Sequence, residues 1–133
     1  DRPGGWAWAL VDGEALLGEG CGREARTTSL LMELTAAMEG LRAAQRLGLS
    51  RVALLTDCHI VVDVLRGSFL PRPPVVRALC ERMLAEATRL SVEPRWVRAH
   101  AGEPWNEAVD ALAAWARDGT PTDTSRDASD FCA

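Results

Sequence analysis

Three carboxylates in this sequence stand where strands and helices are expected to begin or end. Asp57 follows the apolar run at residues 52–55, Glu33 lies in the first two turns of an expected helix, and Asp110 lies early in the last one. Open α/β sheets place their ligands at the carboxyl ends of buried strands. If the strands through residues 57 and 99 run side by side, the three side chains converge at one end of the sheet.

Carboxylates gathered in this way predict a metal-dependent reaction. They repel one another and raise each other's pKa, so such clusters persist when cations occupy them. Hard oxygen ligands favour Mg²⁺, with Mn²⁺ as a substitute, over zinc. Two such ions about 4 Å apart are a standard arrangement for hydrolysing a phosphodiester. His100, in a glycine-containing loop, is a candidate for moving protons at neutral pH.

Each of these residues also has a plainer structural explanation. Asp is a preferred N-cap, so Asp57 could simply cap the following helix. Glu33 would interact favourably with the dipole at the start of its helix. His100 taken alone is most simply a solvent-exposed loop histidine. The presence of three acidic positions together favours the catalytic interpretation.

Composition indicates one globular domain. The chain has 133 residues, of which 47% are hydrophobic. No apolar run approaches membrane-spanning length and no signal peptide is visible. The four cysteines show no Cys-x-x-Cys metal spacing, and we interpret them as reduced thiols of a cytoplasmic protein. The net charge of −4 argues against a broad basic nucleic-acid face but leaves room for a local one.

Apolar periodicity and turn residues predict a mixed sheet with helices on both faces. Strands are expected at residues 5–11, 15–21, 52–55 and 92–99, the third buried on both faces. An Asp12-Gly13 hairpin joins the first two strands, and a polar connection occupies residues 23–28. Helices are expected to begin near residues 28, 58, 74 and 104. Residues 1–118 thus form the domain, and residues 119–133 a polar tail that is disordered or supplies a displaced strand.

Four stretches carry a family resemblance. They are Pro-Gly-Gly-Trp-Ala-Trp-Ala-Leu at 3–10, Thr-Thr-Ser-Leu-Leu-Met-Glu-Leu-Thr-Ala-Ala at 27–37, Thr-Asp-Cys-His-Ile-Val at 56–61 and His-Ala-Gly-Glu-Pro-Trp-Asn-Glu-Ala-Val-Asp at 100–110. In their order and spacing the chain resembles type 1 ribonuclease H. The resemblance implies a mixed sheet flanked by helices, and endonucleolytic cleavage of the RNA strand of RNA–DNA hybrids.

The resemblance also assigns roles to individual residues. It implies that Glu33, Asp57 and Asp110 are catalytic metal ligands, and that His100 is a mobile-loop histidine that assists water activation or product release. Asn106 resembles an asparagine that hydrogen-bonds the RNA strand. Thr28 and Ser29 fall in the stretch that contacts the hybrid, where the family often has two asparagines in place of Ser29 and Leu30.

One departure concerns the first strand. In the family, a strand before the hairpin ends in a further aspartate within an Asp-Gly-Ser-like motif, and this sequence begins after that point. Asp-Ala-Ser at 127–129 resembles the motif, and reading Ala133 straight into Asp1 restores the family's link to the hairpin. Either the chain is circularly permuted, with Asp127 as the fourth carboxylate, or the strand is missing. A site left incomplete would make this a nucleic-acid or protein binding module, and a third possibility is a nuclease of the same fold that acts on DNA.

Overall fold

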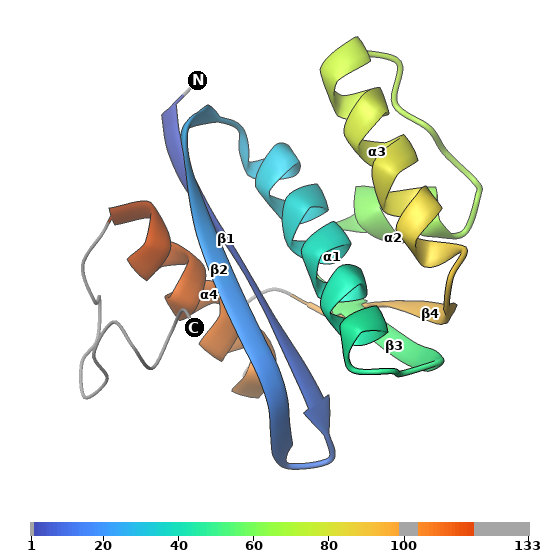
Figure 1. Cartoon of the computed structure of the whole chain (residues 1–133). Coiled ribbons are helices and arrows are strands. Elements are labelled where there is room, and N and C mark those ends of the chain that lie inside the picture. The colour runs from blue at the N-terminus through green and yellow to red at the C-terminus, as the bar shows by residue number, and fades with distance from the viewer. Residues whose placement is uncertain (1, 99–103, 119–133) are drawn as a thin grey trace.

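The computed structural model describes residues 2–98 and 104–118, apart from the side chains of residues 106, 107 and 110 (Figure 1). The described residues form four strands and four helices. In chain order they are β1 (Arg2–Asp12), β2 (Ala15–Thr27), α1 (Ser29–Arg46), β3 (Arg51–Thr56), α2 (His59–Leu65), α3 (Pro74–Ala87), β4 (Ser91–Trp96) and α4 (Pro104–Asp118). The predicted order of strands and helices is confirmed.

The first two strands form a long antiparallel hairpin. The turn lies where Asp12-Gly13 predicts it, and Gly13 has a φ of 62°, which glycine adopts without strain. The hairpin is longer than expected, because β2 continues to Thr27, which pairs with Arg2. The prediction of a polar connection over residues 23–28 is therefore wrong for all but its last residue. Residues 23–26 are exposed, which explains why their polar sequence looked like a loop.

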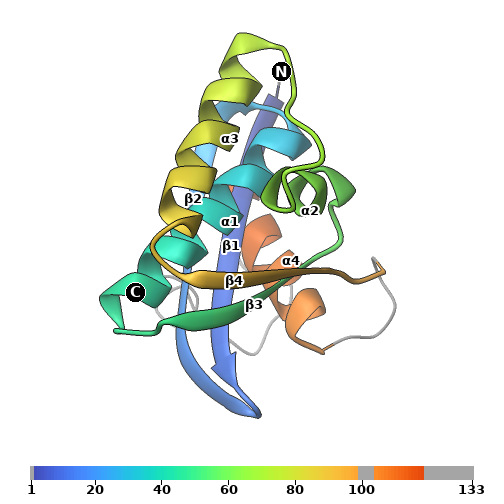
Figure 2. The same ribbon diagram turned by 90° about the vertical axis from the view of Figure 1, so that its right-hand side faces the viewer.

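The other two strands form a parallel pair. β3 and β4 pair from Arg51 opposite Ser91 to Thr56 opposite Trp96. Because β4 ends at Trp96, the expected strand over 92–99 is too long. In the described residues the hairpin and the parallel pair are separate two-stranded sheets, with no hydrogen-bonded pairing between them. Figure 2 shows β3 and β4 crossing beside β1.

Helices cover these sheets and enclose the core. The largest cluster joins α1, α2 and α3 through Leu34, Met38, Leu41, Val61, Val64, Cys80 and Met83. A smaller cluster joins the hairpin to α4 through Ala7 and Leu112, with Cys21, Val109, Ala113 and Trp115 packed around them. The backbone of α4 runs so close to β1 that a Cβ at Gly5 would overlap Ala113 and Arg117. Within the described residues no helix is long and apolar enough to cross a membrane.

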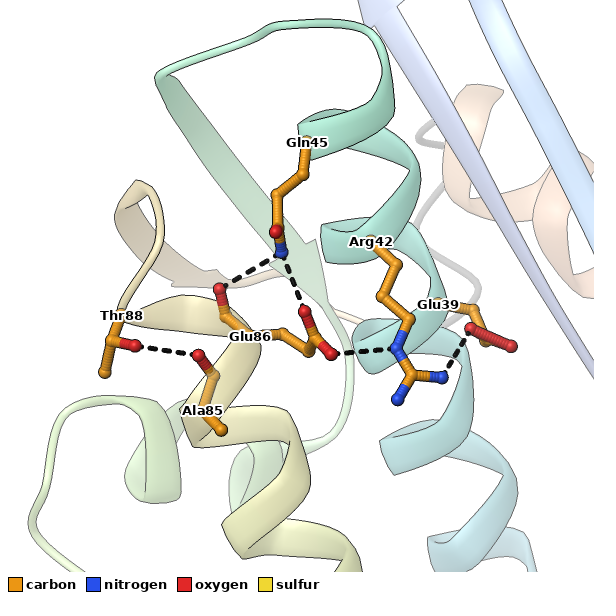
Figure 3. A network of polar contacts seen from close by, with 6 residues as sticks. All are labelled: Glu39, Arg42, Gln45, Ala85, Glu86 and Thr88. Atoms are coloured by element: carbon orange, nitrogen blue, oxygen red, sulfur yellow. Dashed lines mark hydrogen bonds and ion pairs between the residues drawn. The ribbon is translucent and has the colours of Figure 1, made fainter.

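Polar contacts tie α1 to α3 at the surface (Figure 3). Arg42 Nε donates to Glu86 Oε2 at 2.9 Å, and Gln45 Nε2 donates to Glu86 Oε1 at 2.9 Å. Arg42 Nη1 also donates to Glu39 Oε1 at 3.2 Å. The Glu86 carboxylate on α3 thus accepts hydrogen bonds from two side chains of α1. These bonds fix the position of the two helices along each other.

Two sequence expectations about individual residues are wrong. β3 is not buried on both faces: Val52 and Leu54 pack on the main core, but Ala53 is exposed and Leu55 is 48% exposed. These two residues line a cavity beside the strand instead of meeting a covering element. The cysteines are not all reduced thiols either, because Cys21 is disulfide-bonded, whereas Cys58 and Cys80 are free.

Candidate active site

The predicted site residues Glu33 and Asp57 lie on different elements at one cavity. Asp57 directly follows β3, and Glu33 lies in the second turn of α1. Both are half-buried, and both line a cavity of about 500 Å³ between the hairpin and the parallel pair. The neighbouring thiol of Cys58 responds to both carboxylates. Burial is the main cause of its raised pKa, and the charges of Glu33 and Asp57 raise that pKa further. The structure therefore places these two carboxylates at one cavity and near one thiol.

Local sequence explains why each carboxylate stands where it does. Thr28 caps α1, since its hydroxyl accepts a hydrogen bond from the backbone N–H of Leu31 at 3.3 Å. The helix therefore begins at Ser29, which places Glu33 just inside it. On β3 the apolar run ends at Thr56, whose hydroxyl accepts from the N–H of Cys58 at 3.1 Å. That bond turns the chain from strand to helix, with Asp57 at the bend.

The remaining predicted residues come from α4 and the loop before it. Asp110 and Asn106 belong to α4, whose neighbouring residues Trp105 and Val109 line the same cavity as Asp57. The side chains of Asp110 and Asn106, and the whole of His100, lie outside the described residues. In the part of the chain that the structure describes, no three acidic, histidine or cysteine side chains gather as metal ligands. Of the three predicted carboxylates, the structure thus describes the side chains of Glu33 and Asp57.

The two predicted substrate-contacting residues of α1 lie at its start. Ser29 is the first residue of the helix and is exposed, about one turn before Glu33. Thr28 is exposed as well, but its hydroxyl oxygen is engaged in capping the helix. A phosphate near this helix end would meet backbone N–H groups and the positive end of the helix dipole. Of the two, only Ser29, the first residue of the helix, has a hydroxyl that the capping bond does not use.

The structure adds one residue that the sequence interpretation missed. Trp96 ends β4 opposite Thr56, and its indole Nε1 donates to the backbone carbonyl of Asp57 at 3.1 Å. The same indole stacks on His59, with ring centroids 4.5 Å apart and planes 11° from parallel. The signal for Trp96 in the sequence was its place near the end of a strand parallel to the one that carries Asp57.

The cavity itself separates the two sheets. Its walls include the edge of β1 from Gly5 to Asp12, the edge of β3 from Arg51 to Thr56, and apolar residues of α1 and α4. Glu33 and Asp57 are among its few charged residues, together with Asp12 and Arg51. The cavity wall is thus mostly apolar, and the edges of β1 and β3 face each other across the cavity.

Comparison with known proteins gives a consistent family. The family description "RNase H" matches residues 1–118. A ribonuclease H of Phenylobacterium zucineum is 39% identical over 122 residues, covering 84% of this chain and 78% of that protein. A ribonuclease H of Acidiphilium cryptum is 38% identical over 136 residues, covering 92% of this chain and 83% of that protein.

Solved structures agree with the arrangement of the elements. RNase H1 from the halophilic archaeon Halobacterium salinarum superposes with a TM-score of 0.78 at 28% identity, covering 89% of this chain and 88% of that one. LC11-RNase H1 in complex with an RNA/DNA hybrid superposes with a TM-score of 0.77 at 17% identity, covering 88% of this chain and 87% of that one. The second likeness is one of fold alone.

Proposed function

The chain belongs to the RNase H family, and we propose that it hydrolyses the RNA strand of RNA–DNA hybrids with Mg²⁺ or Mn²⁺ held by Glu33, Asp57 and Asp110. The observation that carries the assignment of residues is the convergence of Glu33 and Asp57 on one cavity and on one thiol. The two relatives compared above are 39% and 38% identical over the aligned residues and are ribonucleases H, so an endoribonuclease is favoured over a binding module without activity. The hybrid bound to LC11-RNase H1 supports the substrate class.

The donor set fits a hard divalent cation. Glu33 and Asp57 supply carboxylate oxygens, and no described histidine or thiol cluster competes as a zinc site. Both side chains are half-buried at the wall of one cavity, where a bound cation would balance their negative charges.

The chain's own residues have separable tasks in the proposed reaction. When bound, the cations supply positive charge that activates water and stabilises the departing oxygen. Glu33 and Asp57, from α1 and the end of β3, hold that charge at the cavity wall, and Asp110 adds a carboxylate from α4. We assign His100 the movement of a proton at its imidazole. Ser29, Thr28 and Asn106 are assigned to the hybrid, where backbone contacts position it. The cytoplasm is the proposed location.

The test compares two carboxylates that differ in position. Cleavage of a labelled RNA–DNA hybrid should require Mg²⁺ or Mn²⁺ and stop when a chelator is added. Asp57→Asn should abolish cleavage and leave the fold intact, since removing a like charge relieves repulsion. Asp63→Asn, a matched change on α2 away from the cavity, should cleave at the wild-type rate. Undiminished cleavage by Asp57→Asn would overturn the assignment.

A further inference from the structure

We propose that Trp96 is a positioning residue for Asp57, and that His59 holds the Trp96 indole in place for that task. The inference rests on the proposed function, because it concerns how a carboxylate assigned to the metal is aimed. It starts from the hydrogen bond of 3.1 Å between Trp96 Nε1 and the carbonyl oxygen of Asp57.

The backbone around Asp57 is held from both sides. Before it, the carbonyl of Thr56 accepts from the N–H of Val97 at 2.9 Å, and the Thr56 hydroxyl accepts from Cys58 at 3.1 Å. The Asp57 carbonyl itself lies beyond the last paired residue of β3, so within the described residues it takes no part in strand pairing. The indole of Trp96 supplies the described donor for that carbonyl. By fixing this peptide plane, the hydrogen bond holds the turn that carries the Asp57 side chain in one conformation.

The placement of Trp96 is hard to explain by core packing. Its side chain belongs to neither buried cluster, and the residue is 41% exposed. At this exposure the side chain buries only part of its surface, so burial accounts for only part of the free energy that full burial would give. Its described interactions are instead directed ones: the hydrogen bond to Asp57 and the stack on His59. Both point to the turn that carries the carboxylate.

His59 completes the arrangement because it begins α2 directly after the Asp57 turn. Its exposed ring stacks on the indole almost in parallel, at 4.5 Å and 11°. The stack limits rotation of the indole about its side-chain bonds, so the N–H stays aimed at the carbonyl. Trp96 at the end of β4 and His59 at the start of α2 therefore both act on the turn at Asp57.

Trp96→Phe tests this role because it keeps a ring for the stack and removes the N–H donor. Groups that orient a metal ligand from behind typically change metal affinity or activity by 10- to 100-fold. For one neutral backbone contact at a half-exposed site we expect the low end, about 10-fold. Mn²⁺ affinity, measured by electron paramagnetic resonance of the free ion, should fall by roughly that factor. The kcat for hybrid cleavage should fall with it, while KM for the hybrid stays within about twofold.

Three further variants separate positioning from packing. Trp115→Phe makes the same chemical change at an indole of α4 that packs beside Ala7 and Leu112 and does not line the cavity, and it should bind Mn²⁺ as the wild type does. His59→Ala should show part of the Trp96→Phe loss of Mn²⁺ affinity, and His59→Phe should recover most of it by restoring an aromatic partner.

The inference would be overturned by a Trp96→Phe protein whose Mn²⁺ affinity and kcat equal those of the wild type. If that protein also had a lower melting temperature, the role of Trp96 would be purely structural. A different result identifies failure of the proposed function: Asp57→Asn and the wild type would bind Mn²⁺ equally, and Asp57 would then need no positioning for a metal.

Discussion

The Arg42 guanidinium on α1 and the Glu86 carboxylate on α3 form a hydrogen-bonded ion pair at 2.9 Å. The Arg42 hydrogen bond, followed by that of Gln45, holds the pKa of the Glu86 carboxyl below its usual range. Because the folded-state pKa is lowered, this contact stabilises the fold above the ordinary pKa of a glutamate. The stabilisation is lost as the pH falls through the lowered value.

Glu86→Gln should therefore destabilise the protein near neutral pH. Its effect on the free energy of unfolding should decrease as the pH falls. The pair is partly exposed, so a loss of about 1 kcal/mol in the free energy of unfolding is expected. Urea unfolding of both proteins at pH 7 and near pH 3 measures this difference. Glu81→Gln, whose partner Arg77 lies 3.8 Å away on the same exposed helix surface, is the control and should change the free energy less at pH 7. Equal effects of the two variants at pH 7 would show that Glu86 adds nothing as a link between helices.

Hybrid binding should be weak and only modestly dependent on salt. The net charge is −4, and the loop of residues 68–73 between α2 and α3 carries a single basic residue, Arg72. Few phosphates are then neutralised, so the slope of log affinity against log salt should be shallow. Fluorescence anisotropy of a labelled hybrid, with Ca²⁺ replacing Mg²⁺ to prevent cleavage, gives the slope. A steep slope would reveal a basic surface that the overall charge conceals.

His100 should assist the reaction without being indispensable. If it moves a proton or aids product release, His100→Ala should slow turnover by roughly 10- to 100-fold. Residual activity should remain, because the three proposed metal ligands are intact. Single-turnover and steady-state rates across neutral pH separate the two roles. Wild-type rates for His100→Ala at every pH would leave it an ordinary loop histidine.

The cavity between the two sheets gives the permutation hypothesis a definite test. Permutation requires residues near Asp127 to pair between β3 and β1, and both strand edges line that cavity. Asp127 would then stand beside Asp57, and Asp127→Asn should abolish cleavage as Asp57→Asn does. Asp123→Asn is the matched control within the same tail and should remain active. Full activity of Asp127→Asn, together with rapid hydrogen exchange at the β1 and β3 edges, would exclude the permuted arrangement.

Local sequence signals predicted much of the fold. Thr28 and Asp12-Gly13 are strong cap and turn signals, and the helix and hairpin they predicted are present. The apolar run ending at Thr56 correctly placed Asp57 at a strand end. The cavity could not be predicted, because the separation of two sheets depends on contacts between residues far apart in the chain. For the same reason the exposed Leu55 looked like a core residue.

For the site, the structure describes two of the three predicted carboxylates. Glu33 and Asp57 line one cavity, because their positions follow from a helix start and a strand end. Trp96 was missed, because its role depends on the register of β4 against β3 rather than on any nearby motif. Register is a property of the pair of strands and leaves little trace in either sequence alone.

The proposed metal ligands lie on two parts of the molecule that differ in stability, because each part packs on a different hydrophobic cluster. Glu33 and Asp57 belong to elements that enclose the large cluster, whereas Asp110 is carried by α4, which rests on the hairpin through the small one. Regions with fewer buried contacts open at lower free energy than the molecule as a whole. On warming, α4 should therefore detach while α1 and α3 are still folded. Cleavage would then fail several degrees below the midpoint of the far-ultraviolet circular dichroism transition, and the enzyme would recover on cooling without having to refold its main core.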